Sequence, residues 1–433
     1  MRRSPETITL PASDAPRASI IVLSRRNVEM LRACLISLTH NVGTDTPFEL
    51  IILLNGADED VAAFCEREVA GARVERSRVN LGFPAGCNLA AAQARGAFLV
   101  FLNDDTQVAP RWLESLVQAA DEHPQAGAIG SRLLFADGSV QEAGGVIWRD
   151  GNTAQVGRGR SPASRSYGCL RPVDYCSAAS LLVRRSTWDV VGGFDEEYFP
   201  GYFEDVDLCL AIRQHGQQVL YEPRSQVVHY LSPPLDAGVN ARLFRRNAAR
   251  VKAKWSALLA SHELWDSQSA GAVERAMLRA QGWPRRILII DERLPDPAAG
   301  AASARMVSAI RELRSIGAAI TVSGPQAPED DWDLSSRLGF DVLEGSTIDH
   351  LAAAEVFYDA VIISGPDNLS AYISAIRALQ PQAAVIYDAG GRPLGELERQ
   401  AAGKPDAVTP EQPDGSWIDL FAQARSGRVD EYV

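Results

Sequence analysis

The sequence predicts an α/β protein made of two sheet-and-helix units, and three observations predict it. Short runs of β-branched and other apolar residues alternate with helical patterns between residues 18 and 102. Such alternation is typical of a mostly parallel sheet with helices on both faces. A second, smaller series of the same kind starts at residue 286. The length of 433 residues also fits two or three domains.

The first series supplies most of the predicted sheet. Its strands are short apolar runs at 18–23 (ASIIVL), 48–54 (FELIILL), 72–76 and 97–102 (AFLVFL). Helices are expected between them, over 28–38, 58–69 and 85–94. Residues 136–172 are rich in Gly, Arg and Ser and predict long loops. Regular structure is expected again at 175–183, in a helix starting near Asp205, and in an amphipathic helix over 240–259.

The second series predicts a small Rossmann-like domain. Strands are expected at 286–290, 319–323, 360–364 and 384–387, with a helix over 301–316. It contains neither GxGxxG nor the GxxxxGK[ST] phosphate loop. The predicted organisation is therefore a polar tail (1–17), a first domain (18–260), a linker (261–284), a second domain (285–400) and a polar tail (401–433).

The charge balance restricts the class of partner. The net charge is -12 and no Lys/Arg-rich block is present, which disfavours nucleic acid, because binding phosphates requires a basic surface. An acidic protein that binds a diphosphate would need local positive charge from arginines or from a metal ion.

The cysteines and the N-terminus indicate the compartment. None of the six cysteines forms a CxxC pair, which favours buried reduced thiols over disulfides or a zinc site. Residues 1–17 lack the apolar core of a signal peptide, and no apolar run approaches the ~20 residues that span a bilayer. We expect a cytoplasmic protein, with peripheral contact to the inner membrane left open.

Polar residues follow three of the predicted strands. They are Ser24-Arg25-Arg26, Asn55-Gly56 and Asn103-Asp104-Asp105. In parallel sheets, ligands bind beyond the carboxyl ends of the strands, so these residues should share one edge. Two adjacent carboxylates there favour a divalent cation that is shared with substrate phosphates. A solvated turn ahead of a helix near Pro110 explains the same residues equally well.

A second acidic cluster, Glu204-Asp205-Val206-Asp207, opens a predicted helix. Acids in a first helical turn are stabilised by the helix dipole, typically by ~0.3–1 kcal/mol each, which needs no catalytic role. The alternative is a general base that takes a proton from an acceptor hydroxyl. The aromatic stretch 199–203 before it favours a packed cleft. His229 is a candidate ligand only if it meets Asp105 in space.

Six segments together resemble family 2 glycosyltransferases of the GT-A fold, particularly the bacterial rhamnosyltransferase-like branch, over about residues 18–235. Each is similar to a family stretch, and they occur in the family's order. The segments are NLGFPAGCN (80–88), FLNDDT (101–106), RLLFADGSVQEAGG (132–145), VDYCSAASLLVRR (173–185), GGFDEEYFPGYFEDVDLCL (192–210) and VVH (227–229).

The resemblance implies a role for each candidate residue. Asp105 would bind Mg²⁺ or Mn²⁺, with His229 as a second ligand, and Asp205 would be the catalytic base of an inverting transfer, supported by Glu204. Asp104 would lie near the ribose, Asp195 near the sugar or acceptor, and the remaining residues along the nucleotide-diphospho-sugar donor. Together, these residues are Ser24, Arg26, Asn55, Asn80, Gly82, Phe83, Asn103, Asp104 and Asp195.

Several positions depart from the family's pattern. Ser24-Arg25-Arg26 replaces a frequent Thr-Tyr-Asn, Asn55 stands where a base-contacting Asp is common, and Ala211 replaces a frequent Arg. The donor nucleotide therefore stays open among dTDP, UDP and GDP. The acceptor implied is a glycan or lipid-linked hydroxyl in bacterial surface polysaccharide synthesis, and homo-oligomerisation is left open. The rival hypothesis is a non-catalytic scaffold that binds sugar nucleotide or glycan.

The second domain resembles the N-terminal Rossmann half of a GT-B glycosyltransferase. The likeness lies in residues 285–306 and 358–389. Because a GT-B enzyme binds its donor mostly in a second half, which this chain ends too early to form, we expect no independent transferase activity there.

Overall fold

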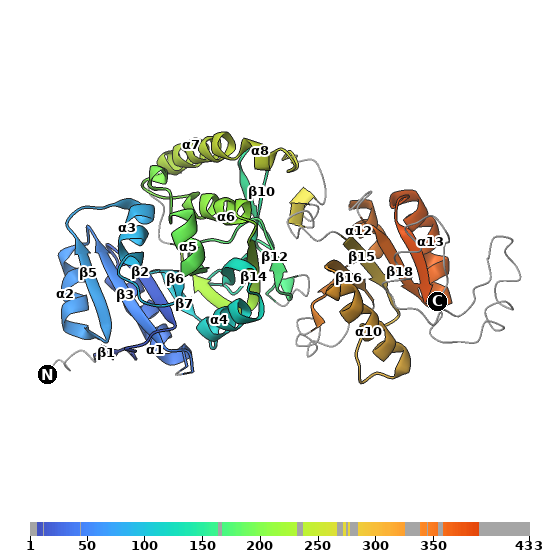
Figure 1. Ribbon diagram of the computed structural model, residues 1–433, viewed down its shortest axis with the longest axis horizontal. Coiled ribbons are helices and arrows are strands. Elements are labelled where there is room, and N and C mark those ends of the chain that lie inside the picture. The colour runs from blue at the N-terminus through green and yellow to red at the C-terminus, as the bar shows by residue number, and fades with distance from the viewer. Residues whose placement is uncertain are drawn as a thin grey trace, which may run out of the picture. The chain divides into compact units, whose positions relative to one another are not determined.

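The computed structural model describes residues 7–388, with gaps at 12, 44, 163–166, 232–236, 266–271, 274–275, 278–284, 325–337, 344 and 354–357. The chain divides into two compact units (Figure 1). The N-terminal unit comprises Met1–Pro162 and Leu170–Trp265, and the C-terminal unit comprises Ala163–Cys169 and Asp266–Val433. The predicted tail at 401–433 and most of the predicted linker lie outside the described residues.

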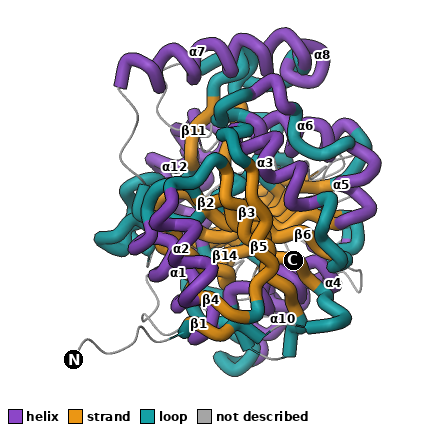
Figure 2. The backbone as a smooth tube through the Cα atoms, turned by 90° about the vertical axis from the view of Figure 1, so that its left-hand side faces the viewer, coloured by secondary structure: helices purple, strands orange, loops and turns teal. Residues whose placement is uncertain are grey.

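The predicted parallel strands form one half of the main sheet. They lie in the order β6-β2-β3-β5, and all three pairings are parallel. The strands are β2 (Ala18–Ser24), β3 (Phe48–Asn55), β5 (Ala72–Ser77) and β6 (Phe98–Asn103). The helices between them are α1 (Val28–Asn41), α2 (Glu59–Glu68) and α3 (Gly82–Ala91), so this strand-and-helix series is confirmed. Figure 2 shows these strands in the middle of the unit with helices around them.

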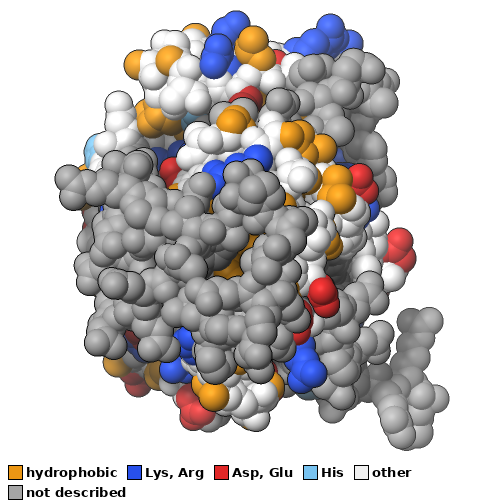
Figure 3. All heavy atoms as spheres, turned by 90° about the vertical axis from the view of Figure 1, so that its right-hand side faces the viewer, with side chains coloured by type: hydrophobic (Ala, Val, Ile, Leu, Met, Phe, Trp, Pro, Cys, Tyr) orange, Lys and Arg blue, Asp and Glu red, His pale blue; other side chains and the backbone are white. Residues whose placement is uncertain are grey.

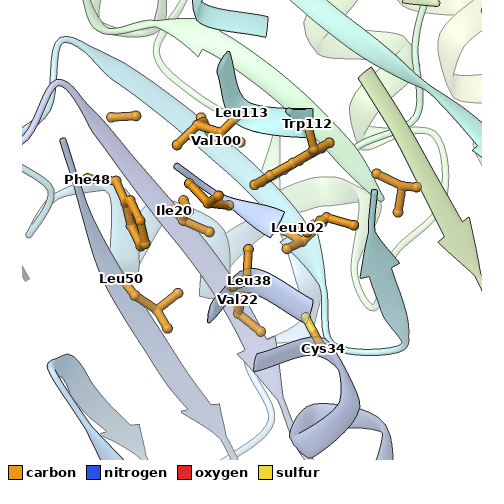
Figure 4. Close-up of a cluster of buried hydrophobic side chains, with 14 of the residues drawn as sticks. Ile20, Val22, Cys34, Leu38, Phe48, Leu50, Val100, Leu102, Trp112 and Leu113 are labelled. Atoms are coloured by element: carbon orange, nitrogen blue, oxygen red, sulfur yellow. The ribbon is translucent and has the colours of Figure 1, made fainter. Parts of the chain in front are cut away.

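One buried cluster holds this half together (Figure 4). Alternate residues of β2, β3 and β6 face α1 and α4 (Trp112–Glu122), because side chains on a strand alternate between its two faces. Each large apolar side chain buried in this way contributes about 1.5–3 kcal/mol. The labelled members are Ile20, Val22, Cys34, Leu38, Phe48, Leu50, Val100, Leu102, Trp112 and Leu113.

The other half of the sheet is mixed, so the prediction of a mostly parallel sheet is wrong there. β13 (Ser180–Arg184) runs antiparallel to both β6 and β8 (Ala126–Leu134). β14 (Gln218–His229) runs parallel to β8, and β7 (Thr106–Val108) pairs antiparallel with β14. Hydrophobic periodicity reports burial of a strand and not its direction, which depends on partners far away in the chain.

Short elements also replace part of the predicted loops at 136–172. They are β9 (Val140–Glu142), β10 (Gly145–Ile147), β11 (Thr153–Gln155) and β12 (Arg171–Pro172). Further elements are β1 (Ile8–Thr9), β4 (Val69–Ala70), α5 (Arg185–Val191), η2 (Glu196–Tyr198) and α6 (Glu204–Gln214). The single helix expected over 240–259 is two helices, α7 (Ala237–Lys254) and α8 (Ser256–Leu259), separated at Trp255.

The C-terminal unit contains a parallel sheet of order β17-β16-β15-β18-β19. Its strands are β15 (Arg285–Ile290), β16 (Ala318–Ser323), β17 (Asp341–Val342), β18 (Ala360–Ser364) and β19 (Ala384–Asp388). The helices are α10 (Ala301–Ser315), α12 (Thr347–Ala353) and α13 (Pro366–Leu379), and apolar clusters cover both faces of the sheet. Across the described part of the chain, no helix has the length and apolar character required to cross a membrane.

Candidate active site

The polar ends of the parallel strands meet at one sheet edge, as predicted. Leu23 pairs with Asn103, and Ser24 pairs with Leu54, so the three strands end at the same level. The Asp104 carboxyl lies near the Ser24 hydroxyl and the Arg25 backbone N–H, both of which favour its charged form. Burial raises the pKa of Asp104 to about 6, and the neighbouring Asp105 charge adds to that rise.

The two arginines at this edge differ in environment. Arg26 is exposed, whereas the Nε atom of Arg25 is buried without a hydrogen-bond partner among the described residues. A buried donor without a partner is costly, so Arg25 has hydrogen-bonding capacity that a bound anion would satisfy. Of the two, only Arg26 is among the residues predicted above to lie along the donor, and no local sequence pattern distinguishes it from Arg25.

Asp105 and His229 come together, which is the condition on which the role of His229 depended. The Asp105 Oδ1 atom lies 3.2 Å from His229 Nε2, and both side chains are largely buried. The antiparallel pairing of β7 and β14 places His229 opposite Thr106, directly after Asp105. On the other side of the ring, Nδ1 lies 3.0 Å from Oε1 of Gln141.

Asp105 Oδ1 and His229 Nε2 are close enough to act as two ligands of one cation. Gln141 Oε1 is within hydrogen-bond distance of Nδ1 of His229, and the other ring nitrogen, Nε2, faces Asp105 Oδ1 and lies 3.4 Å from Asn103 Nδ2. Such a partner on the far ring nitrogen is what orients metal-binding histidines. No group of three or more His, Cys, Asp or Glu side chains suited to a metal occurs among the described residues. A cation here would therefore take further ligands from substrate phosphates and water.

The second acidic cluster lies at the start of α6. One carboxylate oxygen of Asp205 accepts from the Ala178 N–H at 3.1 Å, and the other accepts from its neighbour Val206 N–H at 2.8 Å. The next residue, Ala179, accepts from the backbone N–H of Asn103 at 3.1 Å. The carboxylate of Asp205 and the end of β6 are thus held by consecutive residues of one turn. Burial raises the pKa of Asp205.

Glu204 is buried beside Asp205. Its Oε2 atom has no hydrogen-bond partner within the described part of the chain. Burial, followed by the charge of Asp205, raises the pKa of Glu204 well above its usual range. Burial, followed by the charge of Glu204, raises the pKa of the Cys87 thiol on α3 well above its usual range, so Glu204 lies near this helix.

Sequence reasoning missed a third buried acid, Glu142 on β9. Its Oε1 atom accepts from the Ser177 N–H at 2.8 Å. The next N–H, that of Ala178, donates to Asp205, so two consecutive backbone groups bind the two acids. Burial raises the pKa of Glu142 to about 7, and the charge of Asp205 adds to the rise. The only sequence signal was its position in the QEAGG stretch, which carries no local reason for burial.

The 80–88 segment is held by the asparagines that were expected along the donor. Asn55 accepts from the Leu81 N–H at 2.8 Å and donates to the Gly82 carbonyl at 2.9 Å, while Asn80 accepts from the Gly82 N–H at 2.9 Å. Gly82 has φ +77°, and a Cβ there would lie 2.7 Å from the ring of Phe199. Both asparagines therefore shape this turn, and their contact with a donor stays a prediction.

The segment 195–203, which precedes α6, is hydrogen-bonded to the turn at residues 81–83. The Phe83 N–H donates to the Pro200 carbonyl at 2.8 Å. Asp195 accepts from the Glu197 N–H at 3.0 Å and pairs with Lys254 at 2.8 Å. Burial raises the pKa of Asp195, but Lys254 and the Glu197 N–H outweigh burial, so the net shift is downward. Contact of Asp195 with a sugar or acceptor stays a prediction.

The chain is similar to one protein-family model and to several named proteins. The model of "Glycosyl transferase family 2" matches residues 19–173. The chain is 31% identical over 258 residues to the uncharacterized protein y4gI of Sinorhizobium fredii, covering 57% of this chain and 28% of that protein. It is 32% identical over 237 residues to the O-antigen biosynthesis protein RfbC of Myxococcus xanthus, covering 52% and 18%.

A third relative is matched over more of its length. The chain is 31% identical over 212 residues to the N-acetylglucosaminyl-diphospho-decaprenol L-rhamnosyltransferase of Mycobacterium tuberculosis, covering 44% of this chain and 69% of that protein. The first two relatives are far longer, and the chain spans about a quarter of one and less than a fifth of the other.

Proposed function

Because the chain belongs to glycosyl transferase family 2, we propose that it transfers a sugar from a nucleotide-diphosphate donor to a hydroxyl of a glycan or lipid-linked acceptor. The observation that carries the proposal is the turn Ala178–Ala179, which holds the Asp205 carboxylate on one side and the end of β6 on the other. Relatives named for O-antigen biosynthesis and rhamnosyl transfer support a place in bacterial surface polysaccharide synthesis.

Asp205 is the proposed general base. The acceptor oxygen gives its proton to the Asp205 carboxylate and forms a bond to the anomeric carbon, while the bond from that carbon to the diphosphate oxygen breaks. One displacement from the face opposite the leaving group inverts the configuration. Burial of Asp205 supports this role, because a raised pKa makes a carboxylate a stronger base once it is ionised.

Asp105 Oδ1 and His229 Nε2 would hold Mg²⁺ or Mn²⁺. When bound there, the cation neutralises the charge that grows on the leaving diphosphate. Gln141 keeps the His229 ring in the orientation this requires. Asp104, Asn103 and Ser24 lie at the same edge and would contact the donor, with Arg25 as an added phosphate contact. The nucleotide would be dTDP, UDP or GDP.

We extend the proposal to the rest of the chain. The C-terminal unit would be a Rossmann-like domain, which the reversal of its strand order between β15 and β18 supports. The protein would work in the cytoplasm, peripherally at the inner membrane, where a lipid-linked acceptor is accessible.

The test is donor turnover with and without EDTA. Hydrolysis or transfer from a panel of dTDP-, UDP- and GDP-sugars should require Mg²⁺ or Mn²⁺ and should be lost in Asp105→Ala. Asp189→Asn changes an exposed aspartate of α5 and is the matched control, which should keep full activity. Undiminished turnover in EDTA, or in Asp105→Ala, would contradict the cation role.

The rival function is a non-catalytic scaffold that binds sugar nucleotide. The engagement of both ends of the Asn55 amide with the 81–82 turn favours it, because these two hydrogen bonds give the side chain a structural role in place of contact with a nucleobase. A nucleotide diphosphate that raises the melting temperature, with no turnover across the whole donor panel, would support the scaffold instead.

A further inference from the structure

Two neighbouring residues of the short strand β9 each contact one part of the candidate active site. On one face of the strand, Gln141 Oε1 lies 3.0 Å from Nδ1 of His229, in the candidate cation site. On the other face, Glu142 accepts from the Ser177 N–H at 2.8 Å, in the turn that also binds Asp205. Successive side chains of a strand point to opposite faces, so β9 presents one side chain to each acidic cluster.

Glu142 differs from the acids on the surface of the molecule. Figure 3 shows acidic side chains interspersed with basic ones over the described part of one face, where water solvates each charge. Glu142 is only 1% exposed, and a carboxyl group away from water is costly unless hydrogen bonds compensate. Its two oxygens accept from the Ser177 N–H and, at 3.4 Å, from the side-chain amide of Gln155 on β11. Glu142 is therefore held at both oxygens, and it holds the turn at Ser177 in return.

The turn at residues 177–179 connects Glu142 to the groups proposed to act on substrate. Its first N–H donates to Glu142, its second N–H donates to Asp205, and its last carbonyl accepts from Asn103 at the end of β6. Without Glu142 the first N–H loses its acceptor, and the turn is free to shift. Such a shift would move the Asp205 carboxylate relative to β6, and a displacement of about 1 Å can cost about 100-fold in rate.

We propose that Glu142 is a positioning residue, which fixes the turn 177–179 and thereby the place of the Asp205 carboxylate beside the end of β6. It acts through this turn and not through contact with substrate. The inference rests on the proposed function, because the place of Asp205 affects the rate only if Asp205 is the general base. Gln141 points to the opposite face of β9, so its effect on the cation site should be separable from the effect of Glu142 on the base.

The experiment measures turnover of the full chain in Glu142→Ala and Glu142→Gln, with the donor of the panel that the wild type uses fastest. Rates are expressed per site that binds nucleoside diphosphate, so that unfolded protein does not count. Glu142→Ala should lower kcat about 10–100-fold and leave the donor KM within about twofold of the wild type. Glu142→Gln should keep kcat within about threefold, because the glutamine oxygen still accepts from the Ser177 N–H.

Glu49→Ala is the matched control. Glu49 is also a buried glutamate that accepts from a backbone N–H, that of Arg95 at 2.6 Å. It lies at the start of β3 (Phe48–Asn55), whereas the polar edge lies at the ends of the parallel strands. Loss of Glu49 should therefore lower the melting temperature and leave kcat per binding site unchanged.

Mn²⁺ affinity separates positioning of the base from general support of β9. Calorimetric titration of Glu142→Ala with Mn²⁺, in the presence of a nucleoside diphosphate, should give an affinity within about twofold of the wild type, because Gln141 still orients the ligating histidine. An affinity that falls as far as kcat would overturn the inference, since Glu142 would then only keep β9 in place. A wild-type kcat in Glu142→Ala, or a Glu142→Gln variant as slow as Glu142→Ala, would overturn it as well.

Failure of the proposed function would be recognised separately. A wild-type protein without turnover on any donor would contradict the transferase, and a double-mutant cycle of Glu142→Ala and Asp205→Ala would then decide the inference. Two residues that are held by one turn should give shifts in melting temperature that do not add. Additive shifts would show that Glu142 does not fix the place of Asp205.

Discussion

His229 Nε2 lies 3.2 Å from Asp105 Oδ1, although the two residues are far apart in the sequence of the N-terminal unit. The contact exists because β14 pairs with the short strand β7 that directly follows the acidic pair. Gln141, from a third part of the chain, holds the other ring nitrogen. The candidate cation site is therefore a product of tertiary pairing, and its properties should respond to residues that contact neither donor nor acceptor.

Gln141→Leu should weaken Mn²⁺ binding about 10–100-fold, as loss of the hydrogen bond that orients a ligating histidine usually does. The variant keeps Asp105 and His229 but removes the hydrogen-bond partner of Nδ1. Calorimetric titration with Mn²⁺, in the presence of a nucleoside diphosphate, measures the affinity. Gln118→Leu on α4 is the control, and an unchanged affinity in Gln141→Leu would contradict the ligand role of His229.

Glu142→Gln should stabilise the fold at pH 8 more than at pH 5. Burial raises the pKa of Glu142 to about 7, so between the ordinary value of 4.5 and about 7 the folded state binds more protons than the unfolded state. Stability then falls as pH rises through this window, by about 3 kcal/mol at most. Glutamine avoids the buried charge and still accepts from Ser177.

Melting temperatures at the two pH values check this prediction. Glu66→Gln changes an exposed glutamate and should show no pH-dependent gain. A Glu142→Gln variant that is destabilised equally at both pH values would mean that the carboxylate is not the costly group.

Gly82→Ala should lower the free energy of unfolding of the N-terminal unit by more than the strain of a left-handed alanine alone. A left-handed residue other than glycine costs roughly 1–2 kcal/mol, and the added Cβ would also lie 2.7 Å from the Phe199 ring. Gly138→Ala is a matched control, because Gly138 has φ +83° and nothing within 4 Å of its Cβ position. Urea denaturation of both variants isolates the clash, and equal losses would show that Phe199 moves away freely.

The sequence alone was sufficient to predict the parallel half of the sheet and the polar residues at its edge. β2, β3 and β6 are apolar runs that end in polar residues, and in a parallel sheet such ends share one edge whatever the rest of the fold does. For this reason the sequence alone predicts that Ser24, Asn103 and Asp104 share one edge.

Residues that depend on long-range pairing were not predictable in the same way. Glu142 lies on a three-residue strand whose burial comes from β8 and from the Ser177 turn. The antiparallel direction of β13 likewise depends on β6 and β8. The burial of Glu142 has no local pattern, because period-2 alternation is not visible over three residues. The direction of β13 has none either, because strand direction has no signature in composition.

The most direct measurement is turnover of Asp205→Asn alongside its binding of nucleoside diphosphate. Asparagine keeps the shape and, through its oxygen, the hydrogen bond from Ala178, but it loses the bond from the neighbouring Val206 N–H and cannot take a proton. We predict that transfer or donor hydrolysis falls about 10²–10⁴-fold, while the nucleotide-induced rise in melting temperature stays at the wild-type value. Wild-type turnover in Asp205→Asn would contradict the account, because the proton of the acceptor would then have another destination.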